Sequence, residues 1–229
     1  MPRMVRDITG RFQQRPHYDP REIDNECSTI VCDFLRGLYG QVRFPISSDD
    51  LTKLIEKHTS SFDQYADLSE YGSDVDGLTE FYQKGKPKVS IAERLSGSPV
   101  YENRFRTTMT HELFHAIFHD YLFKMELIVP ASGKGGLQVC MRDNIMSNSK
   151  VSGSKDWMEW QAGYGCGAFL MPLSFLKKTV REFCGGAKET SPLNQSTRQS
   201  EELIEAVMSA FQVSKDAARV RLLVTNLLQ

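Results

Sequence analysis

The chain has 229 residues, enough for one substantial domain or for a domain with a small appendage. Its 28 lysines and arginines nearly balance its 29 aspartates and glutamates, so no overall field would draw it to nucleic acid or to a membrane surface. Its apolar runs are shorter than the roughly 18 residues of a membrane span, and its first residues lack the apolar core of a signal peptide.

The five cysteines are scattered and odd in number. This argues against a disulfide framework and for a reducing compartment. With no candidate membrane segment, the composition predicts a cytoplasmic protein that has no membrane partner.

The first half of the chain is predicted to begin with a loose arm and to continue with two helices. Residues 1–20 are polar and show no periodicity, so we expect an N-terminal arm. Apolar residues recur at helical spacing over 21–38. A second helix is predicted over 48–58, because a Ser-Ser-Asp-Asp run supplies an N-cap ahead of an apolar stripe.

Strand-like segments follow these helices, at 62–68, 77–83 and 87–95. Lys84-Gly85-Lys86 is typical of a hairpin turn between the last two. We therefore expect a small antiparallel sheet that packs against the next helix. A further short strand is predicted at 137–141, within a stretch rich in glycine and serine over 129–155. That stretch fits either a flap over a cleft or an ordinary surface loop.

The helix predicted over 103–121 carries the pattern His111-Glu112-x-x-His115. Residues four apart lie one above the other on a helix, so the two imidazoles project from one face and are close enough to hold one ion. Zinc suits such ligands and lowers the pKa of a bound water toward neutrality. Glu112 lies beside this face, where its carboxylate can act as a general base. The pattern predicts a zinc metallopeptidase that hydrolyses peptide bonds.

Two alternatives concern the same helix. Histidines on an apolar face can be packed and hydrogen-bonded without a metal. For His111 and His115 we favour metal binding over this interpretation. For His119, one turn further on, we favour the packed histidine. The metzincin form of the motif is rejected, because it needs glycine and histidine where this chain has Phe118 and Tyr121.

A catalytic zinc site needs a third protein ligand besides water, and Glu159 is the chosen candidate. It lies on a predicted helix over 157–171, whose small residues indicate close packing against another helix. The alternative is a capping box with Asp156, in which Glu159 would only close the helix N-terminus. The other downstream candidates are Glu126, Cys140, Asp143 and Glu182.

The rest of the chain is predicted to be helical around a polar linker. One helix covers 173–183, and two short helices lie within 200–228, the second capped by Ser214. This pair has helix-turn-helix character, with Arg219 and Arg221 on its second helix. Contact with DNA or a repressor is one interpretation, but a packing module with a solvated basic face is favoured because basic residues are few.

The predicted domains are an N-terminal arm over 1–20, a metallopeptidase domain over 21–184, and a linker with a helical module over 185–229. The predicted fold class is α+β.

Two stretches, 103–115 and 159–172, resemble the ImmA/IrrE metallopeptidases. They correspond to an Arg-x-Arg-Phe-Thr-like lead with H-E-x-x-H, and to an E-x-x-A-N/D helix that ends in Leu-Leu-Met-Pro. The resemblance covers residues 45–175 loosely and these two motifs closely. At the position of the family's Asn or Asp this chain has Gly163. If that Asn or Asp supports a ligand histidine in the family, another group must do so here.

This resemblance implies a zincin-like fold and a helix-turn-helix repressor of mobile-element or stress genes as the protein substrate. It also implies that zinc is held by His111, His115 and Glu159, with Glu112 as the general base. Tyr164 and His119 are the candidates for assisting the oxyanion. The alternative function is a non-proteolytic zinc-binding regulator that acts by binding a partner or DNA. A purely structural zinc domain is less favoured, because Glu112 stands where catalysis needs a base.

Overall fold

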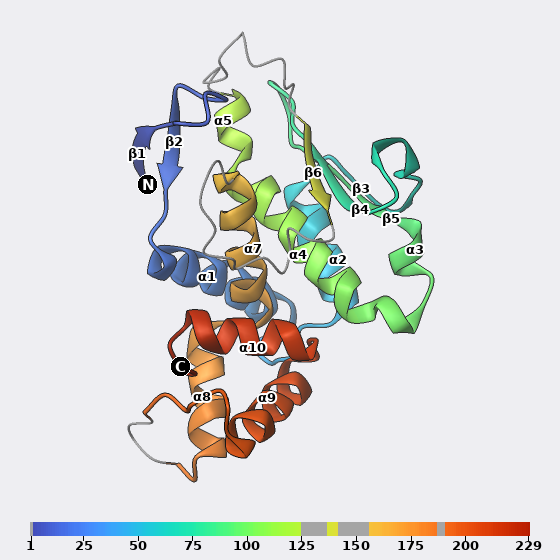
Figure 1. Ribbon diagram of the computed structural model, residues 1–229. Helices are drawn as coiled ribbons and strands as arrows, with labels where there is room; N and C mark the ends of the chain where they lie inside the picture. Colours follow the sequence, from blue (N-terminus) through green and yellow to red (C-terminus); the bar gives the residue numbers. More distant parts are fainter. Residues whose placement is uncertain (1, 125–136, 142–155, 187–190) are drawn as a thin grey trace.

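The computed structural model describes residues 2–124, 137–141, 156–186 and 191–229. It has an α+β fold. Helix α4 (Glu102–Phe118) lies at its centre, with a four-stranded sheet packed on one side and helix α7 (Trp157–Leu170) on another (Figure 1). Thr and His side chains of α4 are buried along with its apolar ones, which is the burial expected of a helix with neighbours on several faces.

The four-stranded sheet has the order β3-β5-β4-β6 and is mixed. Strand β4 (Val75–Glu80) is antiparallel to β5 (Lys88–Ala92) and to β6 (Leu137–Met141), but β3 (Ser61–Ala66) is parallel to β5. The prediction of a wholly antiparallel sheet is therefore wrong in one pairing. The hairpin that returns from β4 inserts β5 between β3 and β4, so β3 meets a strand that runs in its own direction.

The first two long helices follow their predictions closely. Helix α1 spans Pro20–Tyr39, and its N-cap Asp19 forms a capping box with Glu22. Helix α2 covers Ser48–His58, the range predicted, with Ser47 as its N-cap. Single helical turns follow the sheet strands at Ser69–Tyr71 (η1), Glu93–Ser96 (α3) and Pro99–Tyr101 (η2).

The N-terminal segment is not the loose arm that was expected. Strands β1 (Arg3–Arg6) and β2 (Gln14–His17) pair as an antiparallel hairpin. Phe12, in the connecting loop, is only 1 % exposed and packs edge-on against Phe123 and Trp157. The strands are too short to produce a recognisable alternation, and one aromatic anchor leaves no periodic signal.

The C-terminal helices share the core of the rest of the molecule. These helices are α8 (Leu173–Phe183), α9 (Arg198–Phe211) and α10 (Lys215–Val224). The short helix α5 (Asp120–Lys124) comes earlier, directly after α4. Apolar residues of α9 and α10 belong to the same buried cluster as those of α1, α4 and α7. The boundaries predicted at residues 20 and 184 remain predictions.

The two arginines of α10 differ in exposure, since Arg221 is enclosed whereas Arg219 is partly exposed and paired. Arg221 is 2 % exposed and makes an ion pair with Asp24 of α1, while Arg219 pairs with Glu201 of α9 at 2.8 Å. Ser214 caps α10, as predicted. Packing is thus the observed role of Arg221, whose side chain is enclosed.

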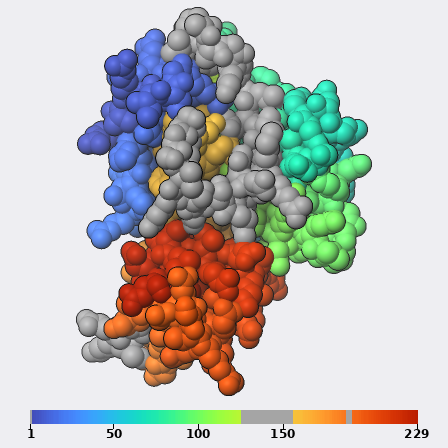
Figure 2. All heavy atoms as spheres, in the orientation of Figure 1, coloured from blue at the N-terminus to red at the C-terminus, as the bar shows by residue number. Residues whose placement is uncertain are grey.

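Figure 2 shows N-terminal residues and the sheet on opposite sides of the face in view, with atoms of α7 between them.

Of the stretch 129–155, which was predicted to be a flap or a loop, only β6 falls within the described residues, and it forms the predicted strand. Among the residues that the structure describes, no helix combines the length and apolarity needed to cross a membrane.

Candidate metal centre

Helix α4 is polar for a buried helix, and its own backbone and its neighbours satisfy much of that polarity. The hydroxyls of Thr107, Thr108 and Thr110 donate to carbonyls four residues earlier, at 2.7 to 3.0 Å. Arg104 binds Asp76 of β4 with two hydrogen bonds at 2.6 Å. The threonine bonds stay within the helix, and the Arg104–Asp76 pair ties the helix to the sheet.

The structure brings the three predicted ligands together. The Nε2 atoms of His111 and His115 lie 3.1 Å apart. The carboxylate of Glu159 lies 3.2 Å from the first and 3.1 Å from the second. One donor atom from each residue falls within 4.8 Å of the others, and both histidines are fully buried. The group could hold a metal ion.

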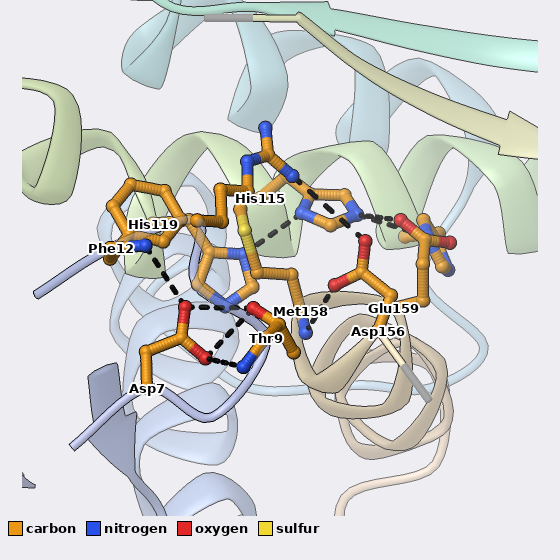
Figure 3. Close-up of polar contacts among 10 residues, drawn as sticks. Asp7, Thr9, Phe12, His115, His119, Asp156, Met158 and Glu159 are labelled. Atoms are coloured by element: carbon orange, nitrogen blue, oxygen red, sulfur yellow. Dashed lines mark hydrogen bonds and ion pairs between the residues drawn. The ribbon is translucent and has the colours of Figure 1, made fainter. Parts of the chain in front are cut away.

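Helix α7 brings Glu159 to the histidines at the start of the helix. Asp156 is the N-cap and accepts a hydrogen bond from the backbone of Met158 at 3.0 Å (Figure 3). The Glu159 carboxylate is directed toward His115, so its role goes beyond closing the helix N-terminus, which was the alternative. The close approach of α7 to α4 has its cause in Gly165, where an added Cβ would lie 2.0 Å from the Phe114 ring.

The donor set fits zinc in its chemistry. Two neutral imidazole nitrogens and one carboxylate are a recognised ligand set of catalytic zinc sites. Burial alone would raise the pKa of Glu159, but the adjacent His111 and His115 hold that pKa well below its ordinary value. Although burial lowers the pKa of His111, Glu159 raises it overall, so without an ion the carboxylate pairs with the protonated imidazole of His111. A bound cation would take the place of that proton.

Glu112 lies beside this group and is hydrogen-bonded to a residue of the sheet. The hydroxyl of Thr79 on β4 donates to its Oε2 at 2.5 Å, while Oε1 has no hydrogen-bond partner among the described residues. Burial raises the pKa of Glu112. At Gly77, also on β4, an added Cβ would lie 2.5 Å from Oε1. Sequence reasoning missed both β4 residues, because nothing local connects that strand to the motif.

The two candidates for assisting the oxyanion have other partners. Tyr164 donates its hydroxyl to Asp24 of α1 at 2.9 Å. His119 lies behind His115, with their Nδ1 atoms 2.8 Å apart, and does not join the ligand group. Its predicted role as a packed histidine agrees with this place.

Of the other candidate ligands, only the Glu182 side chain falls within the part of the chain that the structure describes, and it does not join the group of His111, His115 and Glu159. Glu182 is exposed on α8 near Lys178. Glu126 and Asp143 lie outside the described residues, as does the side chain of Cys140.

No model of a protein family matches the chain, and no curated protein matches it.

Proposed function

We propose that this protein is a zinc-dependent endopeptidase that hydrolyses a peptide bond in a protein substrate. The observation that carries the proposal is the place of Glu112, whose buried carboxylate lies beside a converging group of two histidines and Glu159. A merely structural zinc site has no use for a carboxylate of this kind, whereas hydrolysis needs one.

A bound zinc ion would activate a water molecule and polarise the scissile carbonyl. His111, His115 and Glu159 would hold it. Glu112 is the group that accepts the proton of the water, on Oε1, because Oε2 is engaged by Thr79. Its raised pKa suits a base that later releases the same proton to the leaving amine.

The fold and the partner belong to the same proposal. A central H-E-x-x-H helix packed against a small sheet supports a zincin-like architecture. The resemblance of residues 103–115 and 159–172 to ImmA/IrrE peptidases supports a helix-turn-helix repressor as substrate, and a cytoplasmic location.

The substitution Glu112→Gln tests this function, because it keeps the shape of the side chain and removes its basicity. We expect the zinc content to stay at the wild-type level and the cleavage rate to fall at least about 100-fold. The assay incubates the zinc-loaded protein with a helix-turn-helix repressor encoded beside its gene, and with a proteome-derived peptide library, and identifies products by mass spectrometry.

Glu205→Gln, an exposed change on α9, is the matched control and should leave cleavage unchanged. Wild-type zinc-loaded protein that cuts neither substrate would contradict the proposal. So would a Glu112→Gln variant that cuts as fast as the wild type.

A second candidate is a zinc-binding regulator that acts by binding a partner without cleavage. The complete burial of His111, Glu112 and His115 favours it, since a substrate must reach a catalytic centre. Under this alternative, Glu112→Gln leaves regulation intact, so the same variant separates the two functions.

A further inference from the structure

A line of hydrogen bonds runs from the N-terminal hairpin to the back of a candidate ligand. The Nε2 of Gln161 on α7 donates to the carbonyl of Pro16 on β2 at 3.0 Å. Its Oε1 lies 2.9 Å from Nε2 of His119, and the Nδ1 atoms of His119 and His115 are 2.8 Å apart. All three side chains in this line are buried.

The first link fixes the direction of the whole line. The carbonyl of Pro16 can only accept a hydrogen bond, so the amide group of Gln161 must point its NH₂ at it. The Oε1 of Gln161 then faces His119 and can also only accept. The proton on His119 is consequently on Nε2.

The second link fixes the tautomer of His115. A neutral His119 with its proton on Nε2 has a bare Nδ1, which accepts a hydrogen bond from Nδ1–H of His115. The reverse assignment needs a charged His119. That ring is fully buried and packs edge-on against Trp157 and Phe114, so a charge there would be poorly solvated.

We propose that Gln161 and His119 are positioning residues that hold His115 in its Nδ1–H tautomer, with the lone pair of Nε2 presented to the ion. The same Nε2 atom faces His111 and Glu159 at 3.1 Å. Hydrogen bonds of this kind orient ligand histidines in metal proteins. The N-terminal hairpin becomes part of the metal centre through the Pro16 carbonyl.

This inference rests on the metal-binding part of the proposed function and not on cleavage. Gln161→Met removes the acceptor of His119 at similar size, and His119→Phe removes both ring nitrogens. We expect each variant to bind zinc about 10–100-fold more weakly in competition with a fluorescent chelator, the loss typical of such second partners.

Tyr164→Phe is the matched control, since it removes a buried hydroxyl from the same helix and leaves the line intact. Its zinc affinity should stay at the wild-type level. Wild-type affinity in both Gln161→Met and His119→Phe would overturn the inference.

A second readout needs no variant and uses the zinc-loaded protein. Two-bond ¹H–¹⁵N correlation spectra of labelled histidines report which ring nitrogen carries the proton. We expect a protonated Nδ1 and a metal-bound Nε2 in His115, and a protonated Nε2 with a bare Nδ1 in His119. A His115 that carries its proton on Nε2 would overturn the inference, whether or not the protein cleaves any peptide.

Discussion

Glu112 is confined by the backbone of β4, and Gly77 is the residue that leaves it room. An added Cβ at Gly77 would lie 2.5 Å from Oε1 and 2.9 Å from Cγ of Glu112. Thr79, two residues further along the strand, holds the other carboxylate oxygen. Strand β4 therefore limits the positions that the Glu112 carboxylate can take.

Gly77→Ala should displace Glu112 and destabilise the protein by about 1–3 kcal/mol, the usual cost of overpacking a core. Urea unfolding measures this change. Gly37→Ala is the control, because it lies in α1 with nothing within 4 Å of the added atom. It should stabilise the protein by about 0.4–1 kcal/mol. Equal stability of Gly77→Ala and wild type would contradict the packing described here.

Cys166 offers a second test at the level of single residues. Burial raises the pKa of its thiol to about 12, and the same cause raises the pKa of Cys27. Only the thiolate is nucleophilic, so at pH 8 both side chains should resist iodoacetamide in the folded protein. Peptide mapping should find them modified only in denaturant, and Cys184, which is partly exposed, modified before them. Modification of Cys166 as fast as Cys184 would show that this part of α7 is open.

At the level of elements, the contact between α4 and α7 decides whether the third ligand reaches the histidines. Gly165 faces the Phe114 ring so closely that an added Cβ would overlap it at 2.0 Å. The two residues lie on the helices that carry Glu159 and the motif histidines. A wider spacing of these helices would pull the carboxylate away from the imidazoles.

Gly165→Ala should therefore lower both stability and zinc affinity, with a stability loss of about 1–3 kcal/mol or more. Phe114→Leu in the same chain should restore part of the loss, because a smaller side chain yields the space that the methyl group needs. Thermal unfolding and zinc titration of the single and double variants check both effects. Strictly additive losses would contradict a direct clash.

The elements also show what the sequence could predict. Helix α2 has the predicted bounds, because Ser47 supplies a cap and the apolar stripe reports one buried face. The parallel pairing of β3 with β5 was not predictable, since alternation reports exposure and not which strand is the neighbour. The hairpin of β1 and β2 was missed because its anchor, Phe12, is a single residue.

Some residues of the candidate site could be predicted from the sequence and others could not. His111, Glu112 and His115 follow from spacing along one helix, and Glu159 was chosen from its helix and from resemblance. Thr79 and Gln161 were beyond reach, because each meets the motif helix through the fold, across 33 and 42 residues of sequence.

At the level of the whole molecule, distant segments converge on the motif helix and on its neighbours. Arg106, buried in α4, donates to the carbonyls of Ile46 and Phe211, which are 60 and 105 residues away. Arg221 of α10 binds Asp24 of α1 across 197 residues, and Tyr164 of α7 joins the same carboxylate. The C-terminal helices thus brace the helices that carry the metal centre.

Zinc binding tests the central claim most directly. Metal-free protein, titrated with Zn²⁺ while its thermal unfolding is followed, should bind one ion per chain. At a free concentration of 100 times Kd the ion should add about 2.7 kcal/mol of stability. The same titration should show much weaker zinc binding in Glu159→Ala and in His115→Ala, because each variant lacks one of the proposed ligands. Absence of zinc binding by the wild type, or binding that is unchanged in Glu159→Ala, would contradict the account.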